Sequence, residues 1–240
     1  MKFYQWIGFV CLVVSCDIDA EHCEAKLPDS SVYIGNCEDG LFHGQGKLEW
    51  RDGSSYKGEF NSGLIEGQGI FTSGVGWTHE GSFKDGSLHG YGIYIDPTGD
   101  RYEGEFKHGV YHGVGVFTGR NGDVCKAEYR DGLMHGKGRC SYSDGAKVNA
   151  EWKEGLLSGV GQTLMPNGDL YEGQYRDGYW NGLGTFTYVS GDIYVGEFAN
   201  GMFHGEGEVR YSDGTHLKGK WVKGEYQDST FSEHCESTAI

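Results

Sequence analysis

The protein has 240 residues, of which 43 are glycine and three are proline, and its formal net charge at pH 7 is −15. Proteins that bind nucleic acid need a basic stripe, and anionic membrane surfaces attract basic clusters, so this charge argues against both kinds of partner. Hydrophobic residues make up only 37% of the chain, so a stable fold requires a regular arrangement that brings them together.

A short apolar segment begins the chain. Lys2 precedes the largely apolar residues 3–14, too few to span a bilayer, which needs about 20. This pattern predicts a signal peptide over residues 1–15. The segment ends in V-V-S-C-D at 13–17, which resembles the lipoprotein box of bacterial lipoproteins. The resemblance implies acylation of Cys16, with residues 16–31 as a tether.

The sequence leaves three cellular locations open. A lipoprotein is membrane-anchored and extracytoplasmic, and this is the location that we predict. An ordinary cleaved signal peptide makes the protein secreted or periplasmic. If the segment is neither, it extends the fold of a cytoplasmic protein, since nothing else in the chain argues for export.

A 23-residue repeat occupies most of the remaining chain. Copies begin at residues 33, 56, 79, 102, 125, 148, 171 and 194, with a partial ninth copy at 217. Forty of the 43 glycines fall on positions 3, 8, 12, 14 and 21 of the repeat. Self-similarity at such a period predicts a repeat array, here over residues 32–226. A flexible tail is expected over residues 227–240.

Each copy is predicted to form a β-hairpin. In the fourth copy, residues 102–106 alternate apolar and polar types and 114–118 are β-branched or aromatic, both typical of strands. A turn at 107–109 separates them. A second turn at Asn121-Gly122 recurs in other copies, and such pairs supply the positive φ values that tight hairpin turns need. The predicted fold is all-β: an elongated single-layer antiparallel sheet of about eight stacked hairpins.

Large and small side chains share one face of this sheet, which we call the ring-bearing face. Position 1 is mostly Tyr, position 3 is Gly or Ala, and position 5 is mostly a ring, all on the same side of the pleat. Positions 12 and 14 add glycines and position 16 an apolar residue. We predict that each ring packs over bare glycine backbone, so that stacked copies stabilise one another. Position 10, apolar in every full copy, is expected to close the turn end of the stack.

The repeat carries the pattern Y-x-G-x-[FW]-x-x-G-x-x-H-G-x-G, as in Y-E-G-E-F at 102–106 and H-G-V-G at 112–115. It resembles the MORN (membrane occupation and recognition nexus) repeat family. Copies five and six depart from it at positions 1 and 3, with Cys125, Ala127, Val148 and Ala150. The resemblance implies a protein-binding scaffold, sometimes with a proposed lipid role and often joined to a catalytic domain. Residues 1–31 and 227–240 are expected to be too short for such a domain.

Two polar ladders suggest chemistry, and we interpret both as structural. Position 11 holds the histidines His43, His89, His112, His135 and His204. In adjacent copies they are expected about 9–10 Å apart, whereas zinc needs ligands near 2 Å from one centre. Position 4 holds the glutamates Glu59, Glu105, Glu128, Glu151 and Glu197. They are expected on the flat solvated face, without the cleft that a carboxylate hydrolase uses. The sequence thus predicts no enzyme, no metal and no cofactor.

A protein partner is expected to bind along the ring-bearing face, because aromatic residues anchor interfaces. The predicted contact residues are Tyr102, Phe106, Tyr129, Trp152, Tyr171, Tyr175, Tyr194 and Phe198. The alternative for each ring is a place in the core. The alternatives for the whole chain are a spacer or self-assembling element that makes contacts through its ends, and a cytosolic scaffold without a signal peptide.

The cysteines leave the compartment undecided. After Cys16 the chain has five: Cys23, Cys37, Cys125, Cys140 and Cys235. Cys125 and Cys140 hold positions 1 and 16 of the fifth copy and are placed to pair in an oxidising compartment. The alternative, which we favour, is that they fill ring sites as small apolar residues.

Overall fold

The protein folds into β-strands. The computed structural model describes residues 22–227, so the predicted signal peptide, Cys16 and the tail from residue 228 lie outside the described residues. The described residues form 19 strands of one antiparallel sheet, which confirms the predicted all-β fold. Residues 22–227 contain no helix, and therefore none with the length and apolarity of a membrane span.

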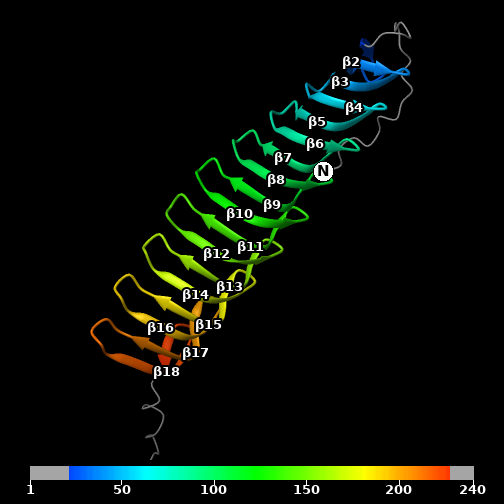
Figure 1. Ribbon diagram of the computed structural model, residues 1–240. Helices are drawn as coiled ribbons and strands as arrows, with labels where there is room; N and C mark the ends of the chain where they lie inside the picture. Colours follow the sequence, from blue (N-terminus) through cyan, green and yellow to red (C-terminus); the bar gives the residue numbers. More distant parts are fainter. Residues whose placement is uncertain (1–21, 228–240) are drawn as a thin grey trace, which may run out of the picture. The chain divides into compact units, whose positions relative to one another are not determined.

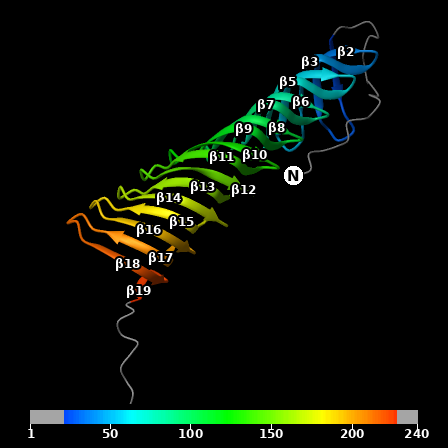
Figure 2. The same cartoon turned by 60° about the horizontal axis from the view of Figure 1, so that its bottom comes forward.

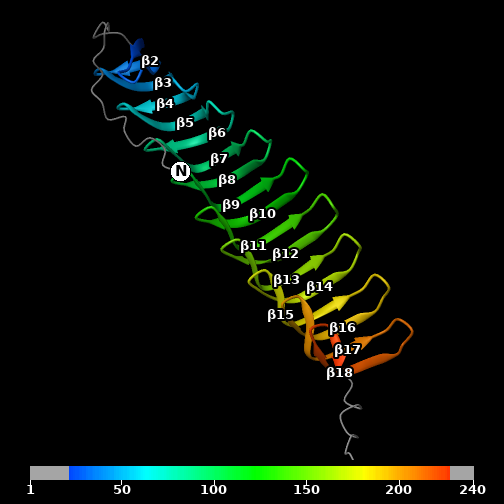
Figure 3. The ribbon, with the colours of Figure 1, turned by 180° about the vertical axis from the view of Figure 1, so that it is seen from behind.

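The chain divides into two units, residues 1–133 and 134–240, and within each unit the strands follow one another in chain order (Figures 1 and 3). The first unit contains β1 (His22–Lys26), β2 (Val32–Glu38), β3 (Leu41–Glu49), β4 (Ser55–Asn61), β5 (Leu64–Thr72), β6 (Thr78–Lys84), β7 (Ser87–Ile95), β8 (Arg101–Lys107), β9 (Val110–Thr118) and β10 (Val124–Arg130). The division falls within β11 (Leu133–Ser141). The second unit continues with β12 (Lys147–Lys153), β13 (Leu156–Leu164), β14 (Leu170–Arg176), β15 (Tyr179–Thr187), β16 (Ile193–Ala199), β17 (Met202–Arg210), β18 (His216–Val222) and β19 (Glu225–Gln227). Figure 2 shows the short β19 after β18.

Each copy of the repeat bends into a hairpin at positions 7 and 8. Both residues have positive φ there, as in His108 (51°) and Gly109 (77°). Such a two-residue turn matches the twist of the strands that it joins. The turn at Asn121-Gly122 is wider than predicted, because only Gly122 has positive φ (95°) and the N–H of Gly119 donates to the carbonyl of Asp123 at 2.8 Å. The tight turn therefore lies at positions 7 and 8, and the Asn-Gly and Asp-Gly pairs sit in five-residue connections.

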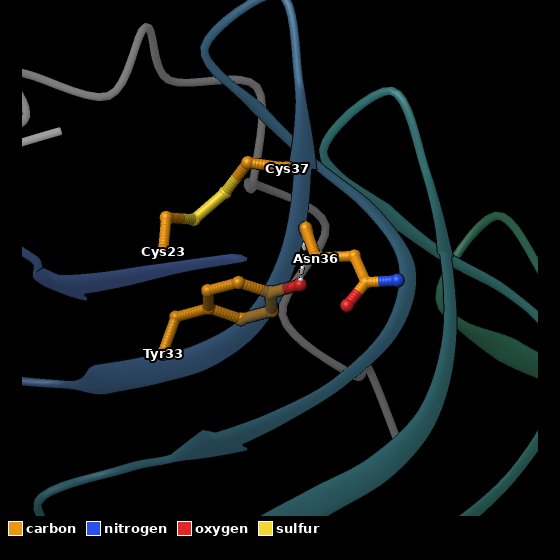
Figure 4. Close-up of a disulfide and its surroundings, with 4 residues drawn as sticks. All are labelled: Cys23, Tyr33, Asn36 and Cys37. Atoms are coloured by element: carbon orange, nitrogen blue, oxygen red, sulfur yellow. Dashed lines mark hydrogen bonds between the residues drawn. A yellow bond between two sulfur atoms is a disulfide. The ribbon is translucent and has the colours of Figure 1, made fainter. Parts of the chain in front are cut away.

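The sheet begins ten residues earlier than predicted. β1 lies inside the segment 16–31 assigned to a tether, and pairs antiparallel with β2, with Lys26 opposite Val32. A disulfide joins Cys23 of β1 to Cys37 of β2, with Cα atoms 6.0 Å apart (Figure 4). Closing a loop of roughly 15 residues stabilises a fold by about 3 kcal/mol in the chain-entropy model. This pair was not predicted, although Cys37 stands where most copies carry a position-5 ring.

Tyrosine rings lie over glycine backbone, as predicted. The Tyr33 ring has no exposed surface, and its hydroxyl donates to the carbonyl of Asn36 at 2.6 Å (Figure 4). A Cβ atom added to Gly35 would sit 2.5 Å from the Tyr33 hydroxyl oxygen, closer than side-chain atoms approach. Burial also raises the pKa of Tyr33 to about 12. The same burial recurs in Tyr56, Tyr102, Tyr171 and Tyr194.

The side chains at position 10 pack against the rings of positions 1 and 5, and do more than close the turn end of the stack as predicted. The Phe42 ring stacks on the Tyr33 ring of its own copy, with centroids 3.7 Å apart and planes 11° from parallel. The position-5 ring of the next copy, Phe60, meets Tyr33 edge-on at 5.1 Å. Stacked and edge-on pairs of this kind add about 0.5–1.5 kcal/mol each to the burial of the rings. Each tyrosine thus links its own hairpin to the following one.

Within copy five and within copy six, the departures at positions 1 and 3 compensate each other. In the five copies with tyrosine at position 1, the tyrosine hydroxyl lies where a position-3 Cβ would be, as for Gly35 with Tyr33. Where Val148 replaces tyrosine, position 3 is Ala150, which is buried. Cys125 and Ala127 show the same combination. A smaller residue at position 1 therefore leaves room for the alanine methyl group at position 3.

Candidate binding face

Most of the rings predicted to contact a partner form the core of the sheet instead. Seven have exposed fractions of 7% or less: Tyr102, Phe106, Tyr129, Tyr171, Tyr175, Tyr194 and Phe198. Trp152 is partly exposed, and its buried Nε1 atom has no hydrogen-bond partner among residues 22–227. The seven offer no surface to a partner in this structure, because the neighbouring copies cover them.

A second set of rings on the ring-bearing face stays partly exposed. In the first unit this set, which we call the aromatic strip, consists of Trp50, Phe71, Trp77, Tyr94 and Tyr111. Successive centroids lie 5.6, 5.0, 6.3 and 6.3 Å apart along that order. The strip is therefore a continuous aromatic surface that runs through copies one to four.

The repeat explains where the strip lies. Phe71 on β5 and Tyr94 on β7 hold position 16, on the same face as the buried tyrosines. Trp50 follows β3 and Trp77 precedes β6, so both come from the connections between hairpins. Position 22 holds Ser, Asp, Ala or Thr in the other full copies and a ring only at Trp77. That exception is the signal in the sequence for the strip, and it lies outside the strand alternation from which the contact residues were predicted.

The second unit has a related surface. Its buried cluster contains Tyr171, Tyr175, Phe186, Tyr194, Phe198, Val209 and Trp221. The side chains that pack against this cluster and stay partly exposed include Met165, Trp180, Tyr188, Phe203 and Leu217. This surface mixes aliphatic side chains and rings, whereas the strip of the first unit is aromatic throughout.

Carboxylates border the strip of the first unit. One Asp96 oxygen accepts hydrogen bonds from the backbone N–H groups of Thr98, Gly99 and Asp100 at 2.8, 2.9 and 3.0 Å. The Thr98 hydroxyl also donates to Asp96 and is the main reason that the pKa of this carboxyl is lowered. Burial, followed by the charge of Asp96, raises the pKa of Tyr94. The rings thus lie next to a carboxylate that remains ionised at neutral pH.

A shallow hollow adjoins the same region. Phe117, Asp100 and Asp123 line it, together with Arg120 and the connections around residues 98 and 121. One Asp100 oxygen accepts from the backbone N–H of Arg120 at 2.8 Å, which holds consecutive connections together. The hollow therefore offers an aromatic ring and carboxylates, with one guanidinium at its wall.

The polar ladders have structural partners. Glu105 and Glu197 accept from the backbone N–H groups of Val114 and Glu206, at 3.4 and 3.2 Å, beside the position-12 glycines. His43 lies 3.3 Å from Glu38. No group of three His, Cys, Asp or Glu side chains within residues 22–227 is arranged to hold a metal ion.

Cys125 and Cys140 are both buried, and both are disulfide-bonded. They are thus more than small apolar fillers of ring sites, the interpretation that the sequence favoured. Their pairing with each other stays a prediction.

Comparisons with solved structures give matches of low identity and low TM-score. No curated protein matches the chain. The TCP10 domain of CPAP from Danio rerio matches over 82% of this chain and 94% of its own, at 12% identity and a TM-score of 0.45. The TCP domain of Drosophila melanogaster SAS-4, solved with a proline-rich motif of Ana2, covers 82% and 88% at 10% identity and a TM-score of 0.36. Virginiamycin B lyase from Staphylococcus aureus covers 82% and 68% at 14% identity, with a TM-score of 0.17. At these TM-scores the likenesses support no functional argument.

The repeats themselves identify the family. The MORN repeat model matches eight segments: residues 33–55, 56–78, 79–101, 102–124, 125–147, 150–170, 171–193 and 194–216. Seven of these segments begin at the repeat boundaries derived from the glycine grid, and the sixth begins two residues inside its copy, at Ala150. Together they cover most of the chain, which is therefore a repeat scaffold and belongs to the MORN repeat family.

Proposed function

We propose that this MORN array is a non-catalytic scaffold that binds a protein partner over the partly exposed rings of its ring-bearing face. The observation that supports this proposal is the aromatic strip of the first unit, where five rings in series stay partly open to solvent. Partly exposed aromatic residues next to fully packed ones are typical anchors of protein interfaces. The buried tyrosines then hold the strip in place rather than contacting the partner.

Site-specific photo-crosslinking in the native host tests this role. A benzophenone amino acid at Tyr94 is expected to give a discrete crosslinked species with a protein partner. Tyr91 is the matched control, because it lies on the same strand, β7, and is 58% exposed on the opposite face. Adducts from Tyr91 but not from Tyr94, or from neither position, would contradict the proposal.

We also propose that the scaffold works outside the cytoplasm and is held at a membrane through acylated Cys16. The Cys23–Cys37 disulfide supports an oxidising compartment, as do the disulfide-bonded Cys125 and Cys140. Mass spectrometry of the mature protein from its host should find a diacylglyceryl group on an N-terminal Cys16. Peptide mapping without reductant should recover Cys125 linked to Cys140. An unprocessed Met1 together with free thiols would refute the location.

A further inference from the structure

The last long strand of the sheet, β18, is paired in full on one side only (Figure 2). On that side it pairs with β17 from His216 to Trp221. On its other side it pairs with the short β19 through Lys220, Trp221 and Val222 alone. The edge formed by residues 216–219 therefore pairs with no other strand among residues 22–227, and its Lys218 carbonyl accepts only from the Tyr226 hydroxyl, at 3.2 Å. An edge strand of this kind is a template for a further strand.

The first strand of the sheet, β1, lacks the opposite kind of partner. Counted back from residue 33, Cys23 and Ala25 hold positions 14 and 16 of the repeat. Cys23 pairs with Gly35 and Ala25 with Tyr33, which is how positions 14 and 16 of copy one pair with copy two. β1 is therefore the second strand of a hairpin, and no strand among residues 22–227 pairs with its other side.

The two unpaired edges have matching lengths and registers. Within a copy, positions 0 to 3 of the first strand pair with positions 17 to 14 of the second, as Val32 to Gly35 pair with Glu49 to Gly46. β18 offers positions 0 to 3 without that partner, and β1 consists of positions 13 to 17. If β1 of a second copy is added to β18 in the register of the array, the opposed pairs are Lys26 and His216, Ala25 and Leu217, Glu24 and Lys218, and Cys23 and Gly219.

Charge favours this combination of edges over the alternatives. Glu24 and Lys218 are both exposed and become directly opposed, and opposite charges in such cross-strand pairs stabilise a sheet. Two β18 edges would instead bring Lys218 and Lys220 of one copy against the same lysines of another. The chain's own continuation does not keep the pattern of the repeat, because positions 14 and 16 of the ninth copy are Thr230 and Ser232, where every full copy has glycine and most have an apolar residue.

We propose that copies of this protein associate head to tail, with β1 of one copy added to the edge of β18 of the next. This inference goes beyond the proposed function, because it uses the ends of the sheet and leaves the aromatic strip open. The Tyr226 hydroxyl then leaves the Lys218 carbonyl, which becomes available to the incoming strand. Because the two contacting surfaces differ, each added copy presents a new edge, and association continues into chains or closed rings.

Sedimentation velocity of the full chain over a range of concentrations tests the proposal. The average mass of the wild type should rise with concentration. Lys218→Glu and Glu24→Lys should each weaken association about 3- to 30-fold, because each opposes like charges, and the two changes in one chain should restore it. Lys57→Glu is the matched control, because Lys57 is exposed at position 2 of an internal strand, and it should have no effect. A constant mass of the wild type, or no recovery in the double variant, would overturn the proposal.

Mixing the variants tests the direction of the contact. Lys218→Glu keeps an unchanged β1, so it should still add to the β18 edge of the wild type and then prevent further growth. A small fraction of Lys218→Glu should therefore lower the average mass of the wild type, whereas Lys57→Glu should not. Equal effects of the two variants would contradict a head-to-tail contact.

A disulfide trap tests the register without changing charge balance at β17, where Lys218 lies opposite Glu208. Glu24→Cys and Lys218→Cys are made in separate chains and mixed under oxidising conditions. Directly opposed residues of antiparallel strands have Cα atoms about 4.5–5.5 Å apart, which a disulfide spans. The mixture should give a covalent dimer that links residue 24 of one chain to residue 218 of the other. Glu24→Cys mixed with Lys57→Cys should give no such link. Absence of the 24–218 link, or equal yield in the control mixture, would overturn the proposed register.

Discussion

Replacing Gly173 by alanine is expected to lower the free energy of unfolding by about 2–3 kcal/mol. A Cβ atom at this position would lie 2.5 Å from the Tyr171 hydroxyl oxygen and 2.6 Å from the Cα atom of Gly184 on the paired strand. Tyr171 has no exposed surface and donates to the carbonyl of Gln174 at 2.8 Å, so its ring has no free space to move into. Urea unfolding followed by circular dichroism measures the change.

A double-mutant cycle separates the destabilisation caused by the Tyr171 ring from the cost of adding a methyl group at position 173 in general. Tyr171→Val alone should cost about 3–5 kcal/mol, the range for loss of a large buried ring. In that background Gly173→Ala should cost less than about 1 kcal/mol, because copy six already combines Val148 with Ala150. The coupling between the two sites is the expected signature of a ring that lies over glycine. Equal costs of Gly173→Ala in both backgrounds would show that the backbone of Gly184, and not the ring, excludes the methyl group.

Replacing His79 by tyrosine is expected to remove the part of the acid-dependent loss of stability that comes from this side chain. His79 holds position 1 of the third copy, is 8% exposed, and packs against the rings of Trp77, Tyr94 and Phe106. Burial lowers the pKa of His79 from 6.5 to about 4. The folded state therefore keeps the ring neutral, whereas the unfolded state binds a proton more readily.

The sign of the pH dependence follows from linkage. Above pH 6.5 His79 is neutral in both the folded and the unfolded state, and its packing contributes fully to stability. As the pH falls from 6.5 towards 4, the unfolded state gains the proton first and stability is lost. The loss is about 2 kcal/mol at pH 5 and approaches about 3 kcal/mol at lower pH, at 1.36 kcal/mol for each unit of pKa difference.

Comparing the wild type with His79 variants separates the effect of His79 titration from that of the carboxylates, because the carboxylates titrate in every one of these proteins. His79→Tyr introduces the residue that five other copies carry at position 1, and His79→Phe removes the titrating group without adding a hydroxyl. Both variants should lose less stability than the wild type between pH 6.5 and pH 4.5 in urea titrations. Parallel stability curves for all three proteins would contradict the assignment.

Much of the fold follows from local pattern in the chain. The 23-residue glycine grid, the alternation in residues 102–106 and the small residues at positions 3 and 14 predict hairpins with rings over glycine, and the structure has them. Local pattern did not reveal β1, because residues 22–26 precede the first copy and become a strand only by pairing with β2. The Cys23–Cys37 disulfide was missed for the same reason, since one of its cysteines lies outside the grid.

The candidate binding face depended on the tertiary structure. The sequence places Tyr102 and Tyr94 on the same face, but only packing shows that Tyr102 is enclosed while Tyr94 stays partly exposed. Phe106 and Tyr129 cover Tyr102 edge-on, each with centroids 5.1 Å away, and Tyr111 stacks on it at 3.8 Å. Strand alternation assigns each side chain to one face of the sheet. This assignment depends only on the residues of one copy, so it can be predicted from the sequence. Whether the side chain is covered depends on rings from the same and adjacent hairpins, so burial was decided only once the copies were stacked.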